Sequence, residues 1–269
     1  MKYQGGKSRT ASKITEAMIE VSREQGKNFQ TTSADNPRSH FADRGARSLV
    51  SLFCGACSIE TKLADHFERV ICNDNHEYLI AMLSAVKDGW IPPDRLSEEE
   101  YTYIRTHKEE NPALTGFVGF GCSFGGKWFG GYARTREKNR NYCSESQRAL
   151  LRDAKHWQNI EFICSDYRDV TLPDGCVVYA DPPYDNTTQY WNGKFSSADF
   201  WEYARTTSKD HLMFISEQNA PDDFVPIWSQ VIKRTLDRSS KNYFSIVEYL
   251  YVHKTWYEKL RLGESNEIN

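Results

Sequence analysis

Mainly apolar runs alternate with polar, glycine-containing stretches, and their lengths and spacing predict short strands and amphipathic helices. Runs typical of buried strands occur at residues 49–53, 69–72, 160–164, 177–180 and 211–216. Apolar positions at helical spacing predict helices over residues 7–23, 55–66, 76–87, 144–157 and 197–208. Two late extended segments, about 228–236 and 243–253, are typical of an antiparallel pair. Strands that alternate with helices predict an α/β fold with a Rossmann-like, mostly parallel sheet.

Residues 94–158 interrupt this alternation and predict an insertion. Within it, residues 116–131 contain seven glycines among five aromatic residues, a pattern that predicts tight turns with exposed rings. The aromatic residues are Phe117, Phe120, Phe124, Trp128 and Phe129. We therefore expect one sheet-forming domain in two parts, residues 1–93 and 159–269, and a mainly helical, hairpin-containing insertion between them.

Composition narrows the class of protein. The chain has 269 residues and a formal net charge of −3, which argues against a general polyanion binder. Residues 127–152 nevertheless carry seven Lys or Arg against two Glu, which indicates either a phosphate-facing surface or a solvated face. There is no apolar run of about 18 residues and no signal-like N-terminus, so we expect no membrane contact and a cytoplasmic location. Seven scattered cysteines suit buried thiols, and the Cys54–Cys57 pair lacks the second pair a zinc site needs, so no metal is expected.

The strongest chemical signal is Asp181-Pro182-Pro183-Tyr184, directly after a predicted strand. Two prolines hold the backbone extended, so the carboxylate and a neighbouring carbonyl become fixed acceptors. Two such acceptors that bind the N–H groups of an exocyclic amine leave its lone pair free to attack. Tyr184 offers a ring on which a base can stack. The simpler alternative is a proline-containing turn after a strand.

Three further features follow predicted strands and fall on the same expected edge of the sheet. The small residues of the turn at 53–58 let the backbone approach a ligand. Asp74 lies 19 residues beyond Gly55, where an acid binds ribose hydroxyls in nucleoside-binding α/β folds. Asp166 ends another strand and can accept from an adenine amino group. Lone acids at such positions are also common helix caps.

The order of these motifs resembles the DNA adenine methylase family, the alpha-group, D12-class N6-adenine DNA methyltransferases. The resemblance begins with Lys2-Tyr3-x-Gly5-Gly6-Lys7 and ends with the motif at 181–184. It implies S-adenosylmethionine as cofactor. By the same resemblance, the turn at 53–58 would line the methionine end of that cofactor, Asp74 would bind its ribose, and Asp166 and Tyr167 would hold its adenine. The residues implied to bind the cofactor are Tyr3, Gly6, Lys7, Phe53, Gly55, Ala56, Cys57, Ser58, Asp74, Asp166, Tyr167 and Asp181. The implied catalytic residues are Asp181, Pro182, Pro183 and Tyr184, with the Pro182 carbonyl as second acceptor.

The resemblance also implies that the insertion is a target-recognition domain for double-stranded DNA. A base within a duplex must be extruded before it reaches a pocket, and the protein must then hold the gap and read its neighbours. The residues expected to contact DNA are Lys127, Trp128, Phe129, Arg134, Arg136, Lys138 and Arg140. Tyr190 and Trp191 are either part of a lid that orders on DNA or packed aromatics of a surface loop.

The leading hypothesis is therefore a site-specific adenine-N6 DNA methyltransferase that transfers the methyl group directly, in line, to a flipped-out adenine. An N4-cytosine DNA methyltransferase and a catalytically silent DNA-binding relative are the alternatives. We expect a monomer or weak dimer. The sequence leaves open the recognition site and whether a cognate restriction enzyme forms a restriction-modification system with it.

Overall fold

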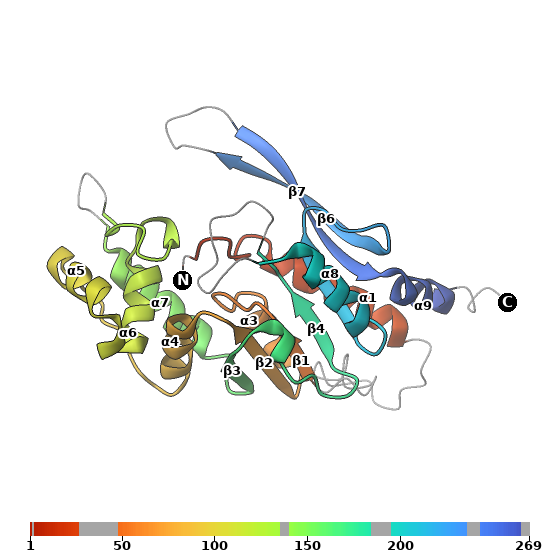
Figure 1. The fold of residues 1–269 in the computed structure, drawn as a ribbon, viewed down its shortest axis with the longest axis horizontal. Helices are drawn as coiled ribbons and strands as arrows, with labels where there is room; N and C mark the ends of the chain where they lie inside the picture. The colour runs from red at the N-terminus through yellow and green to blue at the C-terminus, as the bar shows by residue number, and fades with distance from the viewer. Residues whose placement is uncertain (2, 27–47, 135–139, 184–194, 236–242, 265–269) are drawn as a thin grey trace.

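A seven-stranded sheet forms the centre of the computed structural model, which describes all residues except 2, 27–47, 135–139, 184–194, 236–242 and 265–269 (Figure 1). The strand order is β3-β2-β1-β4-β5-β7-β6. The strands are β1 (Ser48–Ser51), β2 (Arg69–Asp74), β3 (Ile160–Cys164), β4 (Val177–Ala180), β5 (Leu212–Glu217), β6 (Phe224–Thr235) and β7 (Tyr243–His253). The first five strands in that order pair in parallel, whereas β7 runs antiparallel to both β5 and β6.

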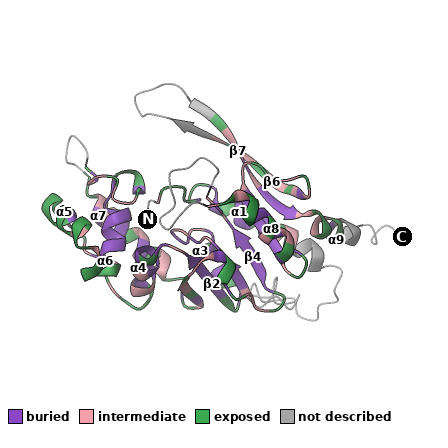
Figure 2. Ribbon diagram, in the orientation of Figure 1, coloured by how far each residue is buried: buried purple, intermediate pink, exposed green. Residues whose placement is uncertain are grey.

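Helices cover both faces of the sheet, which confirms the predicted α/β fold (Figure 1). The helices are α1 (Ala11–Gly26), α3 (Glu60–Leu63), α4 (Glu77–Lys87), α5 (Glu98–Thr106), α6 (Pro112–Gly116), α7 (Tyr142–Ala154), α8 (Ser197–Thr207) and α9 (Lys254–Glu264). Successive strand residues point to opposite faces, so Leu49 packs in the cluster that holds α1 and α4, while Val50 packs with α8. Figure 2 shows the resulting buried strands between more exposed helices.

Local sequence explains where several helices begin. The Ser97 hydroxyl accepts from the backbone N–H of Glu100, and the Glu100 carboxylate accepts from the N–H of Ser97, so α5 starts with a complete capping box. Asn141 and Ser196 cap α7 and α8 with single side-chain acceptors. His76 caps α4 because its Nδ1 accepts from the N–H of Leu79. These caps satisfy backbone donors that a helix start leaves without partners.

The insertion packs as an extension of the main core. Phe117 and Phe120 lie in a turn of π-helix over Phe117–Gly121, and both are buried. They join the same apolar cluster as Leu79 and Met82 of α4. The expectation that the rings of residues 116–131 are exposed is therefore wrong for these two, because α4 supplies an apolar face that the sequence of the insertion alone does not reveal. Phe124 is exposed as expected.

The strand order changes direction between β1 and β4. From β1 the chain moves outward to β2 and β3, and it then returns to the other side of β1 to form β4 and β5. Ligands of open α/β sheets bind where the order reverses, beyond the carboxyl ends of the strands. The fold therefore places its natural crevice beside the ends of β1 and β4.

Candidate active site

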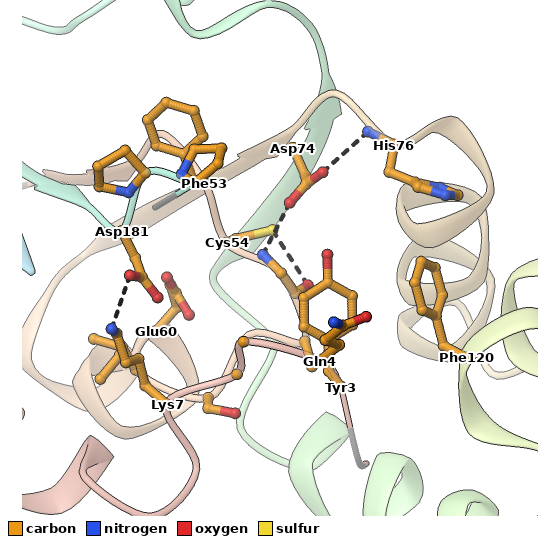
Figure 3. A pocket seen from close by; sticks show the side chains of 18 of the residues that line it. Tyr3, Gln4, Lys7, Phe53, Cys54, Glu60, Asp74, His76, Phe120 and Asp181 are labelled. Atoms are coloured by element: carbon orange, nitrogen blue, oxygen red, sulfur yellow. Dashed lines mark hydrogen bonds and ion pairs between the residues drawn. The ribbon is translucent and has the colours of Figure 1, made fainter. Parts of the chain in front are cut away.

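A pocket of about 480 Å³ opens beyond the ends of β1, β2 and β4 (Figure 3). This volume lies within the range of sites for small ligands and cofactors. Its walls come from the N-terminal segment, the turn after β1, the end of β2, the insertion and the beginning of the motif at 181–184. The predicted site residues that line it are Tyr3, Gly6, Lys7, Phe53, Gly55, Ala56, Ser58, Asp74, Lys127, Trp128, Asp181, Pro182 and Pro183. The fold thus brings most of these separate motifs together.

The turn after β1 needs its glycine. Gly55 has φ +49°, and a Cβ atom there would lie 3.0 Å from Cε1 of Tyr3. The absence of a side chain lets Tyr3 pack across the turn. Cys57 also has a positive φ of 58°, but it is buried beneath the turn with its Sγ 3.7 Å from Sγ of Cys72. Cys57 therefore supports the turn from the core side and does not line the pocket.

Asp74 ends β2 and is fixed by backbone donors. One carboxylate oxygen accepts from the N–H of Gly55 at 3.0 Å and the other from the N–H of His76 at 3.0 Å. Burial raises the pKa of Asp74 to about 6, although these two hydrogen bonds act in the opposite direction. Each oxygen keeps a further lone pair, so the carboxylate can still accept from ligand hydroxyls. This observation fits a nucleoside ribose.

Asp181 follows β4 and is held by an ion pair that spans the chain. Nζ of Lys7 lies 3.0 Å from Oδ1 of Asp181 and also donates to the Glu248 carboxylate of β7. The side chains of Lys7 and Glu248 are only 6% and 1% exposed, so this contact is sheltered from water. Pro182 and Pro183 complete the wall, while Tyr184 lies outside the described residues. The lysine fixes one carboxylate oxygen of Asp181, and the second oxygen lies on a pocket-lining side chain.

Glu60 is a pocket residue that sequence reasoning missed. It is 1% exposed at the start of α3, and its Oε1 accepts from the Ser51 hydroxyl at 2.5 Å. Burial raises its pKa to about 7, and the nearby Asp181 carboxylate acts in the same direction. The available signal was an acidic residue placed directly after the turn at 53–58, where the rest of the segment is small or apolar.

A second carboxyl, Glu217 at the end of β5, has a similar environment. Burial raises its pKa to about 8, and the charges of Asp181 and Glu248 raise it further, while Lys7 lowers it. The region around Asp181 is therefore rich in carboxyl groups of raised proton affinity.

Asp166 and Tyr167 do not line the pocket. Asp166 caps the short helical turn Tyr167–Asp169 and pairs with Arg168 at 2.7 Å, and these hydrogen bonds lower the pKa of Asp166. Tyr167 is buried against Phe53, with ring centroids 5.2 Å apart. Tyr167 thus supports the wall near Phe53, and the role of both residues toward an adenine ring stays a prediction.

An aromatic cluster closes the other end of the pocket. The Trp128 ring lies 4.4 Å from His76 and 4.8 Å from Phe120, and Tyr3 lies 5.0 Å from Phe120, between ring centroids. Burial lowers the pKa of His76 to about 4, so its ring is neutral at pH 7. Phe129 packs edge-on against Tyr101, inside the insertion. This cluster joins the insertion to the N-terminal segment.

Arg134 and Arg140, which are also expected to bind DNA, lie on the surface of the insertion. Arg134 pairs with Glu98 at 2.5 Å and Arg140 with Glu145 at 2.5 Å. The side chains of Arg134, Glu98 and Arg140 are exposed, and that of Glu145 is partly buried. Exposed pairs of this kind are weak, so each arginine can exchange its carboxylate for a phosphate. Arg136, Lys138, Tyr190 and Trp191 lie outside the described residues.

The family model for D12 class N6 adenine-specific DNA methyltransferases matches residues 31–118 and 126–220, about two thirds of the chain. The chain belongs to this family. The family match confirms the resemblance read from the motifs, and it identifies the chain as an adenine-specific DNA methyltransferase with DNA as its substrate. A methyltransferase needs a methyl donor, and the pocket described above is of a size and chemistry to hold one.

The solved structures that match this chain share little sequence with it. They include precorrin-8w decarboxylase from Methanobacterium thermoautotrophicum, at 10% identity and a TM-score of 0.33, over 84% of this chain and 93% of that chain. The tRNA (m1A58) methyltransferase from Aquifex aeolicus matches at 9% identity and a TM-score of 0.31, over 83% of this chain and 71% of that chain. Precorrin-6y C5,15-methyltransferase from Geobacter metallireducens matches at 8% identity and a TM-score of 0.31, over 77% of this chain and 79% of that chain. None of the curated proteins matches the sequence of this chain.

The described residues contain neither a candidate membrane-spanning helix nor a candidate metal-binding cluster. No helix there is both long and apolar enough to cross a membrane. No group of three or more His, Cys, Asp or Glu side chains in the same residues is arranged to hold a metal ion.

Proposed function

We propose that this enzyme methylates N6 of adenine at specific sites in double-stranded DNA, with S-adenosylmethionine as the methyl donor. The observation that carries the proposal is the position of Asp181 in the pocket, fixed by the buried Lys7 and followed by two prolines. A carboxylate fixed in this way on the wall of a pocket is suited to accept from an exocyclic amine.

The donor is proposed to lie along the turn after β1. Asp74 would hold its ribose hydroxyls, and Gly55, Ala56 and Ser58 would let its amino-acid end approach the backbone. Phe53 and Tyr3 would cover it from two sides. Cys57, Asp166 and Tyr167 are proposed to act by shaping this wall, because they lie behind it or beside it.

The target adenine is proposed to reach Asp181 only after extrusion from the duplex. Asp181 and the Pro182 carbonyl would accept the two N–H groups of its amine, and Tyr184 would stack on the base. When bound, the donor would supply a methyl group carried by a positively charged sulfur, and the methyl carbon would pass to the amine nitrogen while the electron pair of the carbon–sulfur bond stays on the sulfur. Asp181, which accepts from the amine in this proposal, would take the proton that the nitrogen loses and pass it on to water. The ion pair with Lys7 would hold the Asp181 carboxylate in place during this step.

DNA is proposed to cross the insertion, where Lys127 lines the mouth of the pocket and Arg134 and Arg140 provide phosphate or base contacts. Trp128 belongs to the insertion and lines the pocket, a position suited to contact the extruded base or its neighbours. The basic balance of residues 127–152 supports this surface. We further propose a monomer or weak dimer that works in the cytoplasm, where buried thiols stay reduced.

The test combines product analysis with a matched substitution. The protein is incubated with methyl-labelled S-adenosylmethionine and duplex DNA, and the DNA is digested to nucleosides. N6-methyladenine is the expected labelled base, and Asp181→Asn is expected to reduce the rate by at least about a hundredfold. Asp222→Asn, at an exposed carboxylate, is the control and should retain full activity.

The alternatives give different results. Labelled N4-methylcytosine would replace the adenine proposal with a cytosine one. No labelled base, together with DNA binding, would indicate a silent relative. Equal activity in Asp181→Asn and the wild type would show that the catalytic acceptor is another residue.

A further inference from the structure

Glu60 holds a carboxyl group that the protein itself satisfies only in part. Glu60 is 1% exposed, and the Ser51 hydroxyl donates one hydrogen bond to its Oε1. Among the described residues, Oε2 is buried and has no hydrogen-bond partner. An unsatisfied carboxylate oxygen in a buried position is destabilising, so a partner from outside the chain is expected.

Lys7, which lines the same pocket, is already engaged elsewhere. Lys7 lies against Asp181 and Glu248, which leaves Glu60 beside Asp181 with no ion pair of its own among the described residues. Figure 3 shows the Glu60 carboxyl next to that of Asp181, and both residues line the pocket. Two neighbouring carboxyls beside one occupied lysine favour a positively charged ligand group with N–H donors.

The chemistry of the proposed donor offers one group that fits. Its sulfonium is positive but carries no hydrogen-bond donor, and its ribose hydroxyls are neutral and suit Asp74. Its methionine end carries an α-ammonium with three N–H donors. We propose that Glu60 binds this α-ammonium group and so fixes the amino-acid end of S-adenosylmethionine beside Asp181. The inference rests on the proposed function, which supplies the donor.

The position of Glu60 agrees with this role. It starts the helix that follows the turn at 53–58, and Ser58 and Ile59 directly before it also line the pocket. Ser51 lies at the end of β1 beneath it and donates to Oε1, which leaves Oε2 for the ligand. A pair formed here would be sheltered from water, and shelter strengthens charge-assisted hydrogen bonds.

Binding should also release protons. The pKa of Glu60 is about 7, so the carboxyl is about half protonated at pH 7, and an ammonium partner would lower that pKa. The other titratable groups that act on Glu60 are Asp181, Tyr179 and the thiols of Cys54 and Cys57. Burial raises the pKa values of Tyr179 and both thiols, so these three stay neutral at pH 7.

The experiment is calorimetric titration of S-adenosylhomocysteine, which cannot be turned over, and of its analogue without the α-amino group. Both are titrated into the wild type, Glu60→Gln and the control Glu77→Gln, whose carboxylate is exposed at the start of α4. Glu60→Gln should weaken S-adenosylhomocysteine about tenfold or more and leave the analogue within about twofold. Glu77→Gln should match the wild type with both ligands. The melting temperature of each variant without ligand checks that it is folded.

A second measurement needs no substitution at all. Titration of the wild type at pH 7 in two buffers of different ionisation enthalpy gives the number of protons released. S-adenosylhomocysteine should release up to about half a proton more than the analogue. Equal weakening of both ligands by Glu60→Gln, or equal proton release by both, would overturn the role of Glu60 alone. No binding of either ligand to the wild type would overturn the proposed donor and this inference together.

Discussion

The contact between Lys7, Asp181 and Glu248 allows a quantitative test of what holds the proposed catalytic carboxylate of Asp181. Lys7→Met keeps most of the volume of the side chain and removes its charge. In the wild type, Nζ lies 3.0 Å from Oδ1 of Asp181, and the Lys7 and Glu248 side chains are 6% and 1% exposed. The substitution therefore leaves the Glu248 carboxylate buried without its ion-pair partner.

The expected loss is large. At an effective dielectric constant of about 20, a unit charge pair at this distance is worth about 5 kcal/mol before desolvation is counted. Removal of one member of a buried pair typically costs about 3–5 kcal/mol, because the remaining charge stays in a dry site. We expect a decrease of this size in the free energy of unfolding for Lys7→Met.

Urea unfolding followed by circular dichroism measures the loss. The double variant Lys7→Met/Glu248→Leu should regain at least half of it, because no buried charge is left on β7. Lys62→Met, at an exposed lysine of α3, is the control and should stay within about 0.5 kcal/mol of the wild type. A Lys7→Met variant as stable as this control, or a double variant no more stable than the single one, would refute the reasoning.

Three further predictions concern DNA binding, pH and packing. Replacing Arg134 and Arg140 together by Gln should reduce the slope of log affinity for DNA against log salt by about two, and an unchanged slope would place the DNA surface elsewhere. His76 has a folded pKa of about 4, below the unfolded value of about 6.5, so the unfolded chain binds more protons in this window and stability falls as the pH drops through it. The free energy of unfolding of the wild type should fall by about 3 kcal/mol by pH 4. Urea unfolding of His76→Gln should show a correspondingly smaller decrease over the same pH range, and equal decreases in the two proteins would contradict this. Gly116→Ala should destabilise by at least about 2 kcal/mol, because its Cβ would lie 1.9 Å from the carbonyl oxygen of Tyr78, and an unchanged melting temperature would refute the clash.

Most of the sheet could be predicted because buried strands are short apolar runs bounded by turn residues. The predicted runs at 160–164 and 177–180 agree closely with β3 and β4, and the late antiparallel pair is β6 with β7. The packing of the insertion was harder to predict from the sequence, because α4 helps to bury two of its aromatic rings. Phe117 and Phe120 look like loop aromatics in a glycine-rich sequence, and only the apolar face of α4 makes them core residues.

The candidate site also contains residues that the sequence predicts and residues that it does not. Motif residues such as Asp74 and Asp181 could be predicted because they follow strands whose ends share one edge. Glu60 could not be predicted, because its proposed role depends on the three-dimensional contacts of its carboxyl group. Ser51 donates to Oε1, and Oε2 has no hydrogen-bond partner among the described residues. Asp166 had two interpretations in the sequence, and in the structure it caps a helical turn and pairs with Arg168.

The ion pair of Lys7 joins residues 241 positions apart in the chain. β7, which carries Glu248, is also inserted between β5 and β6, so β6 cannot join the sheet before β7 has been made. During synthesis, the N-terminal segment and the D-P-P-Y motif therefore leave the ribosome long before the strand that completes the support of Asp181. A nascent chain that ends before β7 would carry the N-terminal segment and Asp181 and still lack Glu248. The strand order therefore makes the full support of the proposed catalytic carboxylate depend on the synthesis of β7.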